Sequence, residues 1–172
     1  MIPLLSSFHF GSVEHYRLLS RHPKVIIDSG EHYERQSYRN RTSIIGPNGK
    51  QDLIVPIEHH HGSKMRMRDV RLSYAETWPQ QHLHAIRSAY GNTPWFIHYI
   101  DQIEAVILKR HARLVDLHLA TIDLGMNWLG LTTEVLVSDK YIENPEGLID
   151  LRTLFHPKKP LRSGSRRSPA DP

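Results

Sequence analysis

Cysteine is absent from the 172 residues of this chain. Its absence excludes disulfide bonds and zinc sites made of thiolates. Long apolar runs are missing too, since no stretch approaches the roughly 18 residues that a membrane-spanning helix needs. The first residues, MIPLLSSFHF, have neither the basic start nor the cleavage site of a signal peptide. We therefore expect a cytoplasmic protein without a membrane span.

Several short motifs that identify a reaction or a ligand are also missing. Ser88 does not lie in a Gly-x-Ser-x-Gly sequence, which argues against a triad hydrolase. The segment GPNGK at 46–50 is too short for a glycine-rich phosphate loop. No His-Glu-x-x-His is present, and the three adjacent histidines at 59–61 cannot all face one ion. The sequence predicts a polar loop there and no metal site, and it identifies no cofactor.

The net charge of +4 is concentrated at one end of the chain. Residues 158–172, KKPLRSGSRRSPADP, hold five Lys or Arg residues and one Asp, so residues 1–157 are neutral overall. The segment is rich in Pro, Ser and Arg and poor in apolar residues, which predicts a disordered tail. Such a tail can bind nucleic acid by releasing counterions, and we expect nucleic-acid binding nowhere else. A tail without a binding role is the simpler interpretation.

The spacing of apolar residues predicts strands first, helices in the middle and a late strand. A hairpin is expected within 42–58, where Asn48 and Gly49 can supply the positive φ angles of a tight turn. Strands are expected at 2–5, 24–29 and 133–138, a short strand at 68–73, and helices at 12–21 (N-cap Ser12; core positions Val13, Tyr16 and Leu19), 77–90, 93–111 and 112–130. This order indicates a mixed α/β (α+β) fold with a single domain, residues 1–157, in which a hairpin-containing N-terminal half packs on a helical middle.

Three segments together resemble the WbqC-like family of bacterial proteins: HYERQSYRNRTSIIGPNGKQDLIVPIE, TWPQQHLHAIRSAYGNTPWFIHYID and LVDLHL. The resemblance covers about residues 1–158. The chain has Leu83 where family members often have Trp, and His118 where they often have Asn. Related chains continue into another apolar stretch, so residues 158–172 look like a truncated or frame-altered C-terminus. The matching residues are Tyr33, Arg35, Gln36, Ser37, Tyr38, Asn40, Arg41, Asn48, Gly49, Val55, Pro56, Trp78, Ser88, Ala89, Tyr90, Pro94, Trp95 and Phe96.

The resemblance implies a role in the biosynthesis of surface polysaccharide (O-antigen). Some family members are described as glycine transferases, which implies transfer of an acyl or aminoacyl group to an amino sugar. The partner would then be a small-molecule substrate, a nucleotide sugar or a sugar-lipid. The competing hypothesis is a non-catalytic module that binds nucleic acid or a partner protein.

An unusual density of hydrogen-bonding side chains occurs in EHYERQSYRNRTSI, residues 31–44. If it formed one strand, Tyr33, Arg35, Arg39 and Arg41 would share a face, and three guanidiniums would be available to a phosphate or carboxylate. A solvated strand whose arginines pair with nearby acids is an equally good interpretation. The candidate substrate-binding residues are Tyr33, Arg35, Gln36, Tyr38, Arg39, Asn40, Arg41 and Tyr90.

Four residues are candidates for acid–base chemistry: His9, Glu31, His32 and His98. A histidine with a pKa near neutrality can accept the proton of an amine nucleophile. Packing or loop hydrogen bonding is the competing explanation for each residue singly. The aromatic residues Tyr90, Trp95, Phe96 and Tyr99 are expected mainly in the core, with the wall of a sugar pocket as their alternative use.

Overall fold

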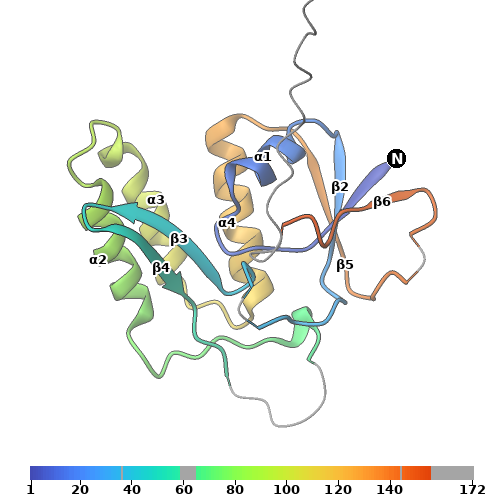
Figure 1. Ribbon diagram of the computed structural model, residues 1–172, viewed down its shortest axis with the longest axis horizontal. Coiled ribbons are helices and arrows are strands. Elements are labelled where there is room, and N and C mark those ends of the chain that lie inside the picture. The colour runs from blue at the N-terminus through green and yellow to red at the C-terminus, as the bar shows by residue number, and fades with distance from the viewer. Residues whose placement is uncertain (36, 59–64, 144, 156–172) are drawn as a thin grey trace, which may run out of the picture.

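The computed structural model describes the chain except for residues 36, 59–64, 144 and 156–172 (Figure 1). The basic tail, the three adjacent histidines and Gln36 therefore lie outside the described residues. The elements are β1 (Ile2–Leu5), α1 (Val13–Leu19), β2 (Lys24–Asp28), β3 (Arg41–Gly46), β4 (Gly49–Ile54), a 3-10 turn (Met67–Asp69), α2 (Trp78–Tyr90), α3 (Phe96–Leu108), α4 (Leu114–Leu129), β5 (Glu134–Ser138) and β6 (Leu148–Asp150). The mixed α/β fold predicted from the sequence is confirmed.

The larger sheet has the strand order β5-β2-β1-β6, and all its neighbouring strands are parallel. The sequence did not indicate β6, which is only three residues long, or the parallel pairing. Helices α1 and α4 lie on one side of this sheet (Figure 1). Because the strands are parallel, the carboxyl ends of β1, β2 and β5 meet at one edge. In open parallel sheets, ligands bind outside this edge.

The smaller sheet is the predicted hairpin, β3 paired with β4. The predicted positive φ is confirmed at Gly49, where φ is 98°, but not at Asn48, which adopts an ordinary negative φ. Leu53 and Val55 are buried, as their alternation with polar residues predicts. The hairpin packs on α2 and lies with α2 and α3 on the opposite side of α4 from the larger sheet (Figure 1).

Two clusters of buried apolar residues form the interior, and α4 contributes to both. Its first half gives Leu114 and Leu117 to a cluster with α2, α3 and the hairpin. Its second half gives Ile122 to a cluster with α1, β1 and β2. In the part of the chain that the structure describes, no helix combines the length and apolar character needed to cross a membrane.

Two local predictions are wrong. Val13 is 82% exposed and does not belong to the core stripe expected for the first helix, although Leu19 is fully buried. Residues 68–73 do not form a strand, because their backbone first makes a 3-10 turn at Met67–Asp69 and then only isolated bridges.

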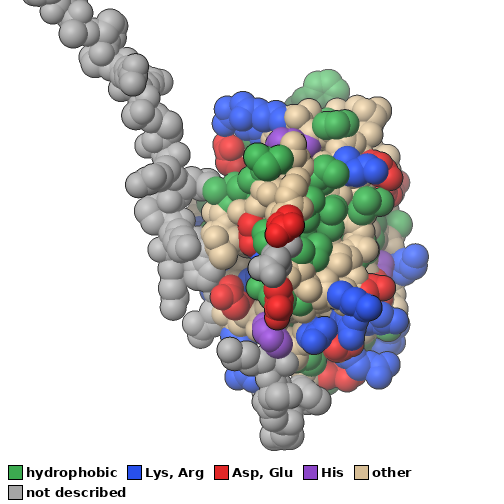
Figure 2. Space-filling model, turned by 90° about the vertical axis from the view of Figure 1, so that its right-hand side faces the viewer, with side chains coloured by type: hydrophobic (Ala, Val, Ile, Leu, Met, Phe, Trp, Pro, Cys, Tyr) green, Lys and Arg blue, Asp and Glu red, His purple; other side chains and the backbone are tan. Residues whose placement is uncertain are grey.

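On the side of the molecule where the larger sheet lies, hydrophobic side chains gather over the middle, and Lys and Arg gather toward the lower right (Figure 2).

We expect Gly125→Ala to destabilise the protein although alanine is the better helix former. A Cβ at this position in α4 would lie 2.3 Å from the ring of Tyr16, which packs across the helix from α1. The helix-propensity gain is about 1 kcal/mol, whereas overpacking costs about 1–3 kcal/mol. Urea unfolding measures the sum. In a Tyr16→Leu background, which removes the ring, the same substitution should stabilise; equal effects in both backgrounds would contradict the packing argument.

Candidate functional site

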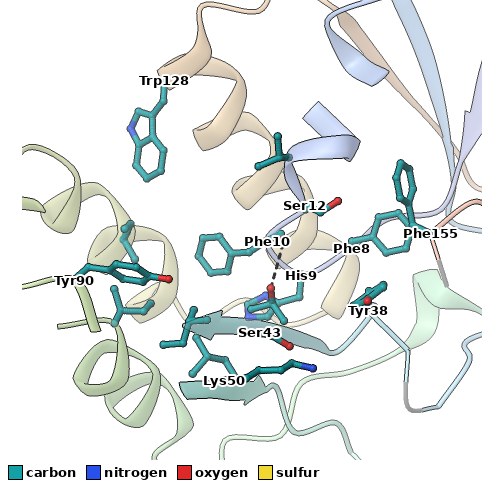
Figure 3. Close-up of a pocket in the computed structure, with 17 residues that line it drawn as sticks. Phe8, His9, Phe10, Ser12, Tyr38, Ser43, Lys50, Tyr90, Trp128 and Phe155 are labelled. Atoms are coloured by element: carbon teal, nitrogen blue, oxygen red, sulfur yellow. Dashed lines mark hydrogen bonds between the residues drawn. The ribbon is translucent and has the colours of Figure 1, made fainter. Parts of the chain in front are cut away.

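A cleft opens where the chain leaves β1 at the carboxyl edge of the larger sheet (Figure 3). Its two adjoining cavities, of about 560 and 490 Å³, share Phe10, Tyr90 and Trp128 among their lining residues. The loop after β1, the hairpin and the helices α2, α3 and α4 form its walls. We call the two cavities together the aromatic cleft.

The rings that line the aromatic cleft are partly open to solvent. Trp95 is 70% exposed, Tyr99 40% and Trp128 37%. Tyr99 and Trp128 meet edge to face at 4.8 Å, and the indole of Trp128 donates a hydrogen bond to Gln102. The prediction that Trp95 and Tyr99 belong mainly to the core is wrong. Their exposure in a concave site corresponds to the alternative, an aromatic wall on which a sugar ring can stack.

His9 is the candidate acid–base residue that lines the cleft. Its side chain is 1% exposed, and neither ring nitrogen has a hydrogen-bond partner among the described residues. Burial, together with His118 and His82, lowers the pKa of His9 well below its ordinary value. The imidazole is therefore neutral at physiological pH. A buried polar group without a partner is uncommon, and it is available to a ligand atom.

The backbone next to His9 is held in an unusual conformation. Phe10 has a φ of 47°, in the left-handed region that residues with a side chain seldom adopt. Its carbonyl accepts a hydrogen bond from Thr42 of the hairpin (Figure 3). At Gly11, a Cβ would lie 2.3 Å from the ring of His15. Backbone strain of this kind persists where the surrounding structure fixes it, and it concentrates at functional sites.

Three further buried histidines surround this loop. His118 of α4 contacts the hydroxyl of Ser7 at 2.8 Å and the carbonyl of Arg39 at 2.5 Å. His82 of α2 contacts the carbonyl of Ile54 at 3.1 Å. His15 has no partner for either nitrogen among the described residues. Burial lowers the pKa of His15 and of His82 to about 4 and that of His118 to about 3.

The segment expected to be one strand, residues 31–44, becomes a strand only at Arg41. Its earlier residues are loop and turn, because Arg39 turns inward to a buried acid. Arg39 is 6% exposed and forms an ion pair of 3.0 Å with Glu31, which also accepts a hydrogen bond from Ser6. Arg39 pairs with Glu34 as well, at 2.9 Å. The predicted face of three guanidiniums is therefore wrong, and the guanidinium of Arg39 is occupied by carboxylates.

The other predicted ligand residues on this segment are dispersed. Arg41 is half-buried and lies 3.5 Å from Asp52 across the hairpin, and Arg35 is exposed. Asn40 donates to the carbonyl of Val55, which fastens the loop to the hairpin. Tyr33 packs against the larger apolar cluster, and burial raises its pKa. None of these four lines the aromatic cleft in the described part of the chain.

The structure does not bring the four candidate acid–base residues together. Glu31 is held in the buried ion pair, and burial raises its pKa despite the neighbouring Arg39. His32 is exposed and lines a different cavity. His98 lies in the first turn of α3, exposed beside Trp95 at a ring distance of 6.2 Å. Of the predicted site residues, His9, Tyr38 and Tyr90 line the cleft.

Sequence reasoning missed Lys50 and Trp128, which also line the cleft. Lys50 lies at the start of β4 beside the tight turn, and Trp128 in the last turn of α4. Trp128 follows the polar Asn127 near the end of α4, and this neighbour is the one sequence feature that indicates, weakly, that Trp128 is exposed. No pattern marked Lys50, because an exposed lysine beside a hairpin turn is ordinary.

We expect Arg39→Met to lower the free energy of unfolding by about 3–5 kcal/mol, because it leaves the buried Glu31 without its cation. Urea unfolding at neutral pH measures the loss. The double variant Arg39→Met/Glu31→Leu removes both charges and should recover much of it. A double variant as unstable as Arg39→Met would show that packing, and not the unpaired carboxylate, accounts for the effect.

We expect stability to fall as the pH drops below 6.5. The unfolded chain binds protons at its histidines near that pH, whereas the buried His15, His82 and His118 bind them only near pH 3–4. Stability is therefore complete above pH 6.5, and each group removes about 1.4 kcal/mol per pH unit below it. Melting temperatures between pH 7.5 and 5 measure the slope. His15→Leu should make it shallower, and an unchanged slope would contradict the assignment.

Comparison with known proteins supports the family resemblance found in the sequence. No curated protein and no solved structure matches the chain. One family model matches residues 13–157, which is most of the sequence and includes the hairpin and all of the helices. The loop after β1, which carries His9 and forms one wall of the aromatic cleft, precedes the matched residues. The chain belongs to the WbqC-like protein family.

Proposed function

We propose that this protein transfers an acyl or aminoacyl group to the amino group of a sugar, in the biosynthesis of bacterial surface polysaccharide (O-antigen). Membership of the WbqC-like family is consistent with a role in polysaccharide biosynthesis. The observation that carries the proposal is the aromatic cleft itself, which has exposed rings along its walls. Its lining also includes the buried His9, whose ring nitrogens have no hydrogen-bond partner in the described part of the chain.

The rings suit a sugar because the C–H faces of a pyranose are apolar and its edges are polar. Trp128 and Tyr90 offer flat apolar surfaces, and the hydroxyl of Tyr90 lies 3.4 Å from the backbone nitrogen of Ile45. Ser43 donates a hydrogen bond of 2.6 Å to Asp52, which lies beside Lys50. Among these groups, the hydroxyls of Tyr90 and Ser43 and the ammonium of Lys50 line the cleft and can bind the sugar edge.

In the proposed reaction, the sugar amine attacks the carbonyl carbon of an activated donor, an ester or thioester. The new C–N bond forms, and the bond from the carbonyl carbon to the leaving oxygen or sulfur breaks. His9 accepts the proton that the amine loses and returns it to the leaving group. A neutral imidazole is the form that can accept a proton, and burial keeps His9 neutral by lowering its pKa. The same shift makes His9 a weaker base than the histidine of near-neutral pKa expected from the sequence.

The burial of His9, which lowers its pKa, also favours a second candidate function, a sugar-binding module without catalysis. His82 and His118 disfavour a positive charge on His9, so His9 would serve only as a hydrogen-bond donor and acceptor. The two functions differ in what His9→Gln does. Glutamine retains a donor and an acceptor but cannot take up a proton at neutral pH.

We expect Trp128→Ala to weaken glucosamine binding about fivefold to tenfold, because ring stacking contributes roughly 0.5–1.5 kcal/mol beyond buried area. Titration calorimetry of the full chain measures the affinity. His9→Gln should retain glucosamine binding within a few-fold but abolish transfer from an acyl thioester or aminoacyl ester to the amine, followed by mass spectrometry of the sugar.

Leu136→Ala provides the matched control, since this β5 residue is 40% exposed and belongs to the other sheet. It should change neither binding nor transfer. Sugar binding without transfer in the wild-type protein would favour the binding module. Equal glucosamine affinity in the wild type and in Trp128→Ala would contradict the placement of the sugar in the aromatic cleft.

A further inference from the structure

A second cavity lies at the same carboxyl edge of the larger sheet, where the chain leaves β2 and β5. Its volume is about 560 Å³, and it shares no lining residue with the aromatic cleft. We call it the cationic cavity. Its lining includes Arg66, Arg68 and Lys140, together with His32, and one carboxylate, Glu143.

The backbone that forms the cationic cavity is tightly braced. Gly30 allows the loops after β2 and β5 to touch, because a Cβ there would lie 2.1 Å from the backbone nitrogen of Tyr141. The buried carboxylate of Asp28 accepts hydrogen bonds from the backbone nitrogens of Gly30 and Ile142. The cavity is therefore formed in advance, and a ligand would not have to order these two loops.

A third segment is fastened to the first two and supplies the arginines. The backbone of Arg66 pairs with that of His32, and the backbone nitrogen of Arg68 donates to the carbonyl of Ser29. The guanidinium of Arg68 also donates to the carbonyl of Asp139 at 2.6 Å. Arg68 is thus oriented by the protein before any ligand arrives, which lowers the entropic cost of binding.

The charges of the cationic cavity are not balanced. Three Lys or Arg side chains line the cavity together with a single carboxylate, and one of the three, Arg68, also lies 3.7 Å from the carboxylate of Asp69. Within the described residues, neither Arg66 nor Lys140 forms an ion pair. Arginine and lysine are the side chains that recognise phosphate oxygens, arginine through paired donors and lysine as a point charge. By contrast, the guanidinium of Arg39, expected from the sequence to bind an anion, is occupied by carboxylates.

We propose that the cationic cavity binds the diphosphate of the carrier to which the sugar is attached. The identification of the ligand as a sugar carrier rests on the proposed function, whereas the anion site rests on the geometry of the cavity alone. Arg66 and Lys140 contact the phosphate oxygens, and Arg68 and His32 complete the set of donors. Diphosphate occurs both in nucleotide sugars and in lipid-linked sugars, and the cavity recognises the group that they share.

The test is titration of the full chain with sodium pyrophosphate at low ionic strength. Arg66→Gln/Lys140→Gln should weaken pyrophosphate binding at least tenfold, because two charge-assisted contacts are lost. Glu143→Gln removes the opposing carboxylate and should tighten binding two- to threefold. Raising the salt from 50 to 200 mM should weaken binding by the wild type, as screening predicts.

The matched control is Arg166→Gln/Arg167→Gln, which removes the same charge from the basic tail. It should leave pyrophosphate affinity within twofold of the wild type. An equal loss in the two double variants, or no pyrophosphate binding by the wild type, would overturn the proposal. Uridine diphosphate and phosphatidylcholine vesicles carrying a polyprenyl diphosphate are then tested as competitors. Displacement of pyrophosphate by one of them supports the site and shows whether the carrier is a nucleotide or a lipid. If neither displaces pyrophosphate, the assignment of a sugar carrier is overturned.

Two crossed measurements separate this proposal from the transferase proposal. Trp128→Ala should retain the pyrophosphate affinity of the wild type, and Arg66→Gln/Lys140→Gln should retain the glucosamine affinity. Loss of pyrophosphate binding in Trp128→Ala would show that the anion lies in the aromatic cleft and would overturn the cationic cavity. If the wild-type protein bound pyrophosphate but not glucosamine, the anion site would be supported and only the assignment of the sugar to the aromatic cleft would be contradicted.

Discussion

The ion pair between Arg39 and Glu31 is the interaction on which both candidate sites depend. The two side chains are each 7% exposed and lie 3.0 Å apart, so their attraction is little screened by water. They close the loop that runs from the end of β2 to the start of β3. His32, which lines the cationic cavity, and Tyr38, which lines the aromatic cleft, both lie on that loop. The carbonyl of Arg39 also meets His118 of α4, so the loop is fixed against the central helix as well.

The carboxyl edge of the parallel sheet explains why two cavities occur where they do. The chain leaves β1 toward His9 and the aromatic cleft, and it leaves β2 and β5 toward the cationic cavity. Side chains beyond this edge are free of the strand register, so they can turn inward or outward as packing allows. The protein places aromatic rings beside one strand end and a group of cations beside the others. This division of chemistry suits a ligand with an apolar-faced sugar and an anionic group.

The alternation of Leu53 with Val55 and the Gly49 turn predicted the hairpin, and the apolar spacing of α2 and α4 predicted those helices. These signals are local. Pairing of the arginines with nearby acids was the alternative interpretation of residues 31–44, and Arg39 does pair with Glu31 and Glu34. The sequence did not indicate that residues 31–40 would form a loop, because the loop results from the burial of Arg39 against an acid eight positions earlier. Likewise, Trp95 was expected in the core but is exposed, because a sequence does not show which side of a helix remains uncovered by the rest of the protein. Arg66 and Lys140 belong to segments far apart in the chain, and only the sheet brings them to one cavity.

Helix α4 supplies Leu114 and Leu117 to one apolar cluster and Ile122 to the other. Neither cluster can lose this helix without exposing its own interior to water. We therefore expect the hairpin half and the parallel-sheet half to unfold together, in one transition, on heating or in denaturant. Truncation before Leu114 would remove α4 and, with it, the residues that this helix contributes to the apolar clusters. Neither half is therefore expected to fold when it is expressed without α4.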